Sequence, residues 1–158
     1  MPYYRRPYKR ARYGKRLKYS VQQKAVEFST GSDDQTAKVE IVPASEIEGM
    51  RKVKHLTVSL ATEADGGAFY WALVYVPQGT TPANLQVNIV TGTTGMYEPN
   101  QFVMNCGCID PSAGPIRFTS PVSRNLNDGD SVYLLVRNTN NTVAITYNAV
   151  VRYAITLQ

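Results

Sequence analysis

Few residues in this sequence have the types and spacing that catalysis requires. Its one histidine, His55, lies in no HxH or HExxH pattern. A single residue is too few for a zinc site, because such a site takes three or four protein ligands. No GxSxG elbow, P-loop or GxGxxG phosphate loop occurs. We therefore predict that the protein is not an enzyme, that it binds no cofactor or metal, and that His55 lies at a surface or an interface.

The two cysteines of the chain, Cys106 and Cys108, are separated by one glycine. On a strand they would share one face, but they lack the second pair of ligands that tetrahedral zinc needs. We predict that both thiols are buried, as free cysteines in a reducing compartment usually are. Oxidative linking of one chain to another is the alternative.

Three pairs of carboxylates offer oxygen ligands of the kind that a divalent cation prefers: Asp33 with Asp34, Glu46 with Glu48, and Asp128 with Asp130. The third pair lies in Asp128-Gly129-Asp130, which lacks the further ligands of an EF-hand loop. A turn that leads into a strand explains this third pair better.

The strongest chemical signal is the first nineteen residues, which hold eight cations and no acid. Such a block stays solvated or binds an acidic partner, and tyrosine rings among the cations suit the stacking faces of exposed bases. We predict that residues 1–19 are an arm that binds nucleic acid, and a nuclear-import signal is compatible with it. The predicted contact residues are Tyr3, Tyr4, Arg5, Arg6, Tyr8, Lys9, Arg10, Arg12, Tyr13, Lys15, Arg16 and Lys18.

The remaining residues, 20–158, are here called the body. The chain has a net charge of +5, but its body alone has nine basic and twelve acidic residues, a net −3. A body of this length can bury a core of its own. The longest apolar run, residues 68–76, is too short to span a membrane, and no apolar signal segment follows the arm. We expect one domain, made in the cytosol and not inserted in a membrane.

Short β-branched and aromatic runs separated by turn residues predict an all-β body without helical crossovers. Between residues 51 and 60, alternation places Val53 and His55 on an outer face, and Lys54 and Leu56 on a core face. A two-sheet antiparallel sandwich of the jelly-roll type is the expected architecture. Eight strands are predicted at 37–42, 51–60, 68–76, 85–90, 102–109, 116–119, 131–137 and 143–157, and a ninth at 21–29 if that segment is not part of the arm.

Two of these strands carry further information. The run 68–76 is apolar on both faces, which indicates either a subunit contact or a second layer of core packing. Arg51, Lys52 and Lys54 form a second basic cluster beside His55. This cluster either adds to a cationic inner surface, or is a solvated strand face or an edge protected by lysines.

Three segments behind the arm carry a family resemblance: FYWALVYVPQGTTPANL (69–85), MYEPNQFVMNCGCID (96–110) and RNLNDGDSVYLLV (124–136). Together they resemble capsid proteins of small circular single-stranded DNA viruses that encode a replication initiator, the circovirus-like group. The resemblance implies a single jelly roll that assembles, in many copies, into a small icosahedral T=1 shell around circular DNA.

We therefore expect a capsid protein that packages single-stranded DNA, or RNA when it is expressed alone. Host import machinery and a host surface receptor would be further partners, and the virion, nucleus and cytoplasm its locations. The alternative is a β-sandwich DNA-binding protein that uses the same arm and forms no shell. A secreted carbohydrate-binding sandwich is disfavoured by the lack of a signal segment.

Overall fold

The computed structural model describes residues 18–31, 36–62, 68–86, 96–97, 102–110, 112, 114–138 and 144–156. Most of these residues form nine strands, and no helix among them is long and apolar enough to cross a membrane. The strands are β1 (Tyr19–Thr30), β2 (Ala37–Val42), β3 (Arg51–Thr62), β4 (Phe69–Val76), β5 (Val103–Ile109), β6 (Ile116–Ser120), β7 (Arg124–Leu126), β8 (Ser131–Asn138) and β9 (Ile145–Thr156).

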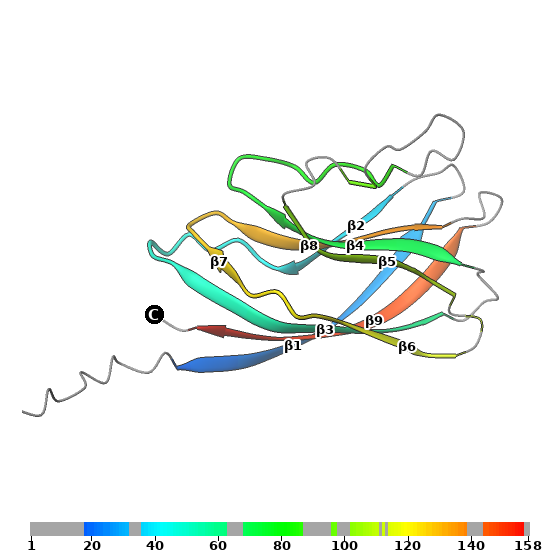
Figure 1. The fold of residues 1–158 in the computed structure, drawn as a ribbon, viewed down its shortest axis with the longest axis horizontal. Coiled ribbons are helices and arrows are strands. Elements are labelled where there is room, and N and C mark those ends of the chain that lie inside the picture. The colour runs from blue at the N-terminus through cyan, green and yellow to red at the C-terminus, as the bar shows by residue number, and fades with distance from the viewer. Residues whose placement is uncertain are drawn as a thin grey trace, which may run out of the picture.

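The strands form two facing antiparallel sheets (Figure 1). The first sheet has the order β1-β9-β3-β6, with β7 also paired to β3, and the second has the order β2-β8-β4-β5. Strands from the beginning and the end of the chain are therefore neighbours in both sheets, as in two interlocked Greek keys. The prediction of an antiparallel jelly roll is confirmed.

The strand count is nine because one position in the first sheet is occupied twice. β6 and β7 both pair with β3, and residues 121–123 between them belong to neither strand. Pro121 lacks a backbone N–H and so interrupts the ladder. The sequence allows the segment 21–29 to be either a strand or part of the arm. In the structure it lies within β1, which pairs with β9 along its whole length.

The core lies between the two sheets, where aromatic side chains pack across the gap. The rings of Trp71 and Phe118 are stacked with centroids 4.0 Å apart, and the ring of Tyr147 meets Phe69 edge-on at 5.4 Å. Such pairs add to the stabilisation from burial. Because each pair joins strands of different sheets, the two sheets are locked face to face.

A β-bulge corrects the predicted faces of β3. Val53 and Leu56 are both fully buried, whereas Lys54 is half-buried on the opposite side. The register with β9 shifts between Lys54 and Thr57, and His55 has a positive φ of 53°. The inserted residue lets Val53 and Leu56 face the same core. The prediction that Lys54 faces the core and Val53 faces outward is wrong, because simple alternation stops at the bulge.

The second apolar face of β4 is covered by the same chain. Residues outside the strands, among them Leu85 and Tyr97, pack against the outer side of the second sheet. The cluster of buried side chains there consists of Ala72, Val74, Val76, Leu85, Tyr97 and Leu135, with Met96, Phe102 and Val103 beside them. Packing within the chain therefore accounts for the two-sided apolar run, and a subunit contact is not needed to explain it.

The strand predicted for residues 85–90 does not begin where expected. Leu85 and Gln86 lie outside every strand, and residues 87–90 lie outside the described ranges. The N–H of Leu85 donates to Thr36 Oγ1 at 3.0 Å, and its carbonyl accepts from Arg137 Nη1 at 2.7 Å. Because side chains satisfy this backbone, Leu85 is buried without joining a ladder.

Candidate nucleic-acid interface

The arm enters the fold at the start of β1. Of the predicted contact residues, only Lys18 lies within the described ranges, where it is exposed immediately before Tyr19. The other eleven, between Tyr3 and Arg16, lie outside those ranges. Their role stays a prediction, and the described residues of the candidate interface lie around the start of β1.

Two residues join the root of the arm to the first sheet. Lys54 Nζ lies 3.5 Å from the centre of the Tyr19 ring, a distance typical of a cation–π contact. Tyr19 pairs with Thr156 on β9, and Thr156 Oγ1 accepts a hydrogen bond of 2.7 Å from the N–H of Lys52. β1, β9 and β3 are thus tied together at the end of the sandwich where β1 begins (Figure 1).

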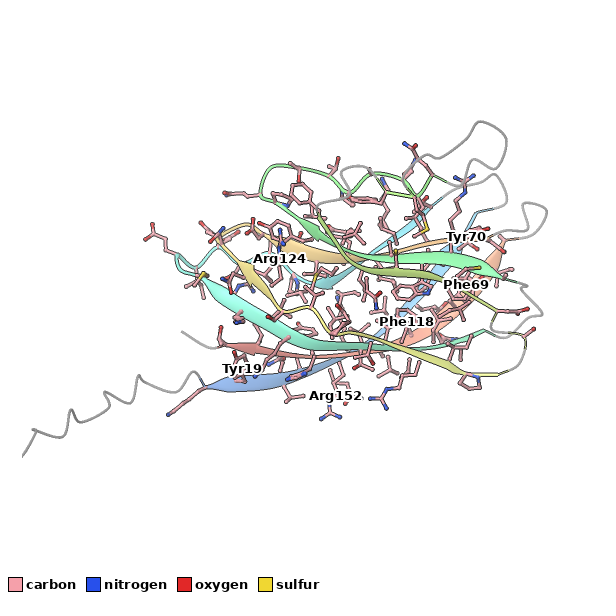
Figure 2. The ribbon with its side chains drawn as sticks, viewed as in Figure 1. Tyr19, Phe69, Tyr70, Phe118, Arg124 and Arg152 are labelled. Atoms are coloured by element: carbon pink, nitrogen blue, oxygen red, sulfur yellow. The ribbon has the colours of Figure 1, made fainter. Side chains whose placement is uncertain are left out.

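A polar depression of about 460 Å³ lies at the same end, beside β7. Lys52, Ser123, Arg124 and Asn125 contribute to its lining, and Arg124 Cζ lies 4.5 Å from the centre of the Tyr75 ring. The ring limits the positions that the guanidinium can take. Figure 2 shows Arg124 and Tyr19 toward this end of the molecule. Two cations with neutral hydrogen-bond donors form a surface that suits an anion.

A buried carboxylate holds this depression in shape. Asp130 is 3% exposed and accepts hydrogen bonds from Tyr75 Oη at 2.7 Å, from the N–H of Asn127 at 2.7 Å and from the N–H of Gln78 at 3.0 Å. Burial raises the pKa of Asp130, but these hydrogen bonds and the charge of Arg124 outweigh it, so the pKa lies below its ordinary value.

The phenol of Tyr75 shows the reverse effect. Burial, together with the Asp130 hydrogen bond and charge, raises the pKa of Tyr75 to about 12. At neutral pH, Asp130 is therefore an anion and Tyr75 a neutral donor.

The segment around Asp128 is a turn that leads into β8, as the sequence predicted. Gly129 has a φ of +73°, and a Cβ there would overlap the side chain of Gln78.

The basic cluster predicted at residues 51–54 divides between two sides of β3. Arg51 Nη2 donates to the carbonyl oxygens of Pro43 at 3.2 Å and Asp130 at 3.3 Å, so Arg51 supports the turn. Lys52 and Lys54 lie on the other side by alternation. Of the predicted alternatives, an edge protected by lysines is wrong, because β3 has paired neighbours on both of its sides, whereas a strand face agrees with the positions of Lys52 and Lys54.

The cysteine prediction is also corrected. Cys106 and Cys108 are both exposed free thiols on β5, which is an edge strand of the second sheet. Gly107 faces the opposite way, and a Cβ there would lie 3.1 Å from Trp71 Nε1. The core-facing position of this edge strand is therefore the glycine, and the thiols face outward because they alternate with it.

The remaining candidates are placed as follows. His55 is exposed at the bulge of β3, as predicted for a surface residue. Glu46 and Glu48 are exposed in the loop before β3, whereas Asp33 and Asp34 lie outside the described ranges. Within the part of the chain that the structure describes, no three His, Cys, Asp or Glu side chains gather into a possible metal site.

Sequence reasoning missed Arg124, Arg117 and Arg152 as candidate contacts. Arg124 lies in one of the quoted motifs, but its place over Tyr75 depends on the pairing of β7 with β3. Arg117 and Arg152 each alternate with buried or half-buried neighbours on their strands, and this is the local signal for a solvent-facing cation. That signal does not reveal that the two strands share a sheet.

No protein-family model matches this sequence, and a search of curated proteins gives no match. Among solved structures, the fold is similar to a chain of infectious bursal disease virus (Gt strain), with 8% identity and a TM-score of 0.45, over 88% of this chain and 32% of that chain. It is also similar to Desmodium yellow mottle tymovirus, with 16% identity and a TM-score of 0.39, over 100% of this chain and 97% of that one.

A third similar structure is empty-head turnip yellow mosaic virus, with 15% identity and a TM-score of 0.34, over 88% of this chain and 84% of that one. The chain thus spans about a third of the length of the bursal disease virus chain and most of the length of the two other viral chains. Because these TM-scores are low, the function proposed below depends on the residues of this chain.

Proposed function

We propose that this protein is a viral capsid protein that assembles with copies of itself into a small icosahedral T=1 shell. The observation that carries the proposal is the jelly-roll strand order with a basic arm leading into its first strand. Jelly rolls serve chiefly in viral capsids, lectins and cupins. An arm with eight cations suits packaging of a polyphosphate and has no role in binding a neutral sugar.

The packaged molecule is single-stranded DNA from the virus, or RNA when the protein is expressed alone. Support for a circular DNA genome comes from the three segments that resemble circovirus-like capsid proteins. The arm binds phosphates through its cations and stacks bases on its tyrosines. Import into the host nucleus uses the same cations before assembly, and a host surface receptor binds the finished virion.

Eight phosphate contacts predict a log–log salt slope of about −6 for binding to single strands, at about 0.7 per contact. Many arms in one shell act together, so a weak individual arm is sufficient. Replacing all eight cations between Arg5 and Lys18 with glutamine should make the salt slope less steep by about 6. Replacing Tyr3, Tyr4, Tyr8 and Tyr13 with leucine should leave that slope and reduce only the salt-resistant part of binding.

The decisive test is to express the full chain and examine it by negative-stain microscopy and sedimentation. Closed shells of uniform size support the capsid assignment, and the ratio of absorbance at 260 and 280 nm reports their nucleic acid. A lasting monomer or dimer at high concentration that still binds DNA would instead support the non-capsid DNA-binding protein. Shells of the glutamine variant that keep a wild-type absorbance ratio would refute packaging by the arm.

A further inference from the structure

The nine basic residues of the body differ in what their charged groups contact. Five of them are engaged with the protein itself. Lys24, Lys38 and Arg51 donate to backbone carbonyl oxygens, as Arg137 does to Leu85, and Arg124 lies over the Tyr75 ring. The four that donate hydrogen bonds to carbonyl oxygens are poor candidates for holding a ligand, whereas Arg124 belongs to the depression beside β7.

The other four basic residues gather on one surface. Lys52, Lys54, Arg117 and Arg152 come from β3, β6 and β9, which are adjacent strands of the first sheet. Within the described ranges, the charged groups of Lys52, Arg117 and Arg152 have no hydrogen-bond or ion-pair partner, and that of Lys54 meets only the Tyr19 ring. We call the side of this sheet that faces away from the second sheet the basic face.

The pairing register sets these side chains beside one another. Arg152 pairs with Thr57, and Thr57 pairs with Thr119, so one row crosses three adjacent strands. Arg117 lies two residues along β6 from Thr119 and therefore points to the same side. In Figure 2, Arg152 projects from the first sheet away from the second one.

These residues line a shallow depression of about 380 Å³ together with His55, which the bulge of β3 presents there. The Thr57 and Thr119 hydroxyl oxygens lie 3.5 Å apart in the same depression. Two guanidinium groups provide forked donors that match phosphate geometry, and two hydroxyls add neutral donors. No carboxylate lines this depression in the described part of the chain.

With one exception, the described acidic residues of the body lie away from the basic face. The exception is Glu27, the one acid among the described strands of the first sheet, which shares this side of the sheet but pairs with Asn148, four residues along β9 from Arg152. Glu40 lies in the second sheet, Asp110 follows β5, and the others described lie in the loop before β3 and the turn before β8. A body with a net charge of −3 therefore carries a face with four cations, and this separation favours a polyanionic partner.

The position of the arm indicates which polyanion. β1, the strand that follows the arm, forms one border of the basic face, and the Tyr19 ring at its start lies against Lys54. A nucleic acid bound by the arm therefore reaches this face without crossing another surface. A second copy of the same face would be repelled by its like charge.

Building on the capsid function proposed above, we propose that the basic face is a second nucleic-acid site that binds the phosphate backbone of the packaged single strand. Arg117 and Arg152 bind phosphates directly, with Thr57 and Thr119 as neutral donors, while Lys52 and Lys54 connect the site to the arm. Recognition is through the backbone and is therefore independent of base sequence.

The test uses the full-length protein with both Arg117→Gln and Arg152→Gln. The matched control carries Lys24→Gln and Lys38→Gln, which removes the same charge from exposed residues outside the basic face. Binding of a fluorescent oligo(dT) strand is measured by anisotropy over a range of salt concentrations, and thermal melting checks that each variant folds.

Loss of two phosphate contacts should make the log–log salt slope less steep by about 1.4 and weaken binding at 0.15 M salt roughly tenfold. The control should keep the wild-type slope. A double variant with an unchanged slope overturns the proposal, as does a control that changes equally. Loss of binding to a sulfated polysaccharide with unchanged DNA binding would overturn it too, and would assign the face to a sulfated glycan.

These outcomes are distinct from failure of the capsid function. If no shells form but the double variant shows the smaller slope, the capsid assignment fails and the nucleic-acid site stands. If shells form and only the arm variant changes the slope, the capsid assignment stands and the second site is wrong.

Discussion

Replacing Asp130 with alanine should destabilise the protein far more than the same change at Asp128 in the same turn. Asp130 is buried and accepts three hydrogen bonds, whereas within the described residues Asp128 accepts none. The Tyr75 hydroxyl is the buried donor of the three and would lose its partner. The N–H groups of Asn127 and Gln78 belong to exposed residues, so water can replace the carboxylate there.

An unsatisfied buried donor costs about 1–3 kcal/mol, and the two exposed hydrogen bonds add a smaller amount, so Asp130→Ala should lower the free energy of unfolding by about 3 kcal/mol. Asp128→Ala should change it by less than about 0.5 kcal/mol. Combining Asp130→Ala with Tyr75→Phe should recover about 1–2 kcal/mol relative to the sum of the single changes, because the orphaned hydroxyl is gone. Urea unfolding of the four variants measures all of these values.

The pH dependence gives an independent readout. Because the pKa of Asp130 is lower in the folded protein than in the unfolded chain, its ionised form stabilises the fold above the unfolded value, near 3.9. This stabilisation is lost as the pH falls through the folded pKa. The stability difference between wild type and Asp130→Asn should thus be constant from pH 5 to 7 and shrink below about pH 4. An Asp130→Ala variant as stable as Asp128→Ala would refute this reasoning.

Three further predictions follow from particular positions. Gly107→Val should cost about 1–3 kcal/mol in urea unfolding although valine favours strands, since its Cβ meets the Trp71 ring, and an unchanged stability would contradict that contact. His55→Val should cost about 1–2 kcal/mol and His55→Gly less than about 1 kcal/mol, because only glycine adopts the positive φ freely; equal costs would argue against the bulge. Cys106 and Cys108 should both react with a thiol reagent in the folded protein, and a reaction that needs denaturant would show that they are buried.

The sequence alone was sufficient to predict the all-β architecture and the separation of charge between a basic arm and an acidic body. Alternating apolar residues and turn signals are local properties, so they predicted the all-β fold and most strands before any pairing was known. The turn at Asp128-Gly129-Asp130 was predicted for the same reason, since its geometry depends on adjacent residues. The charge of the arm is likewise a property of composition, independent of how the body folds.

Registers and faces required the tertiary structure. The bulge at His55 reverses the alternation of β3, and it is defined by pairing with β9, near the other end of the chain. Whether the cysteines or Gly107 face the core depends on the position of Trp71 on the neighbouring strand. A local pattern cannot contain this information, because a shift of one residue exchanges the two faces of a strand.

The basic face depends on the tertiary structure for the same reason. Arg117 and Arg152 are distant in sequence, and each is an unremarkable solvent-facing cation on its own strand. Only the order β9-β3-β6 brings them to one side of one sheet. The sequence thus determined that eight cations are concentrated in residues 1–19, for which nucleic-acid binding is a prediction, whereas only long-range strand pairing decided which cations of the body lie together on one sheet.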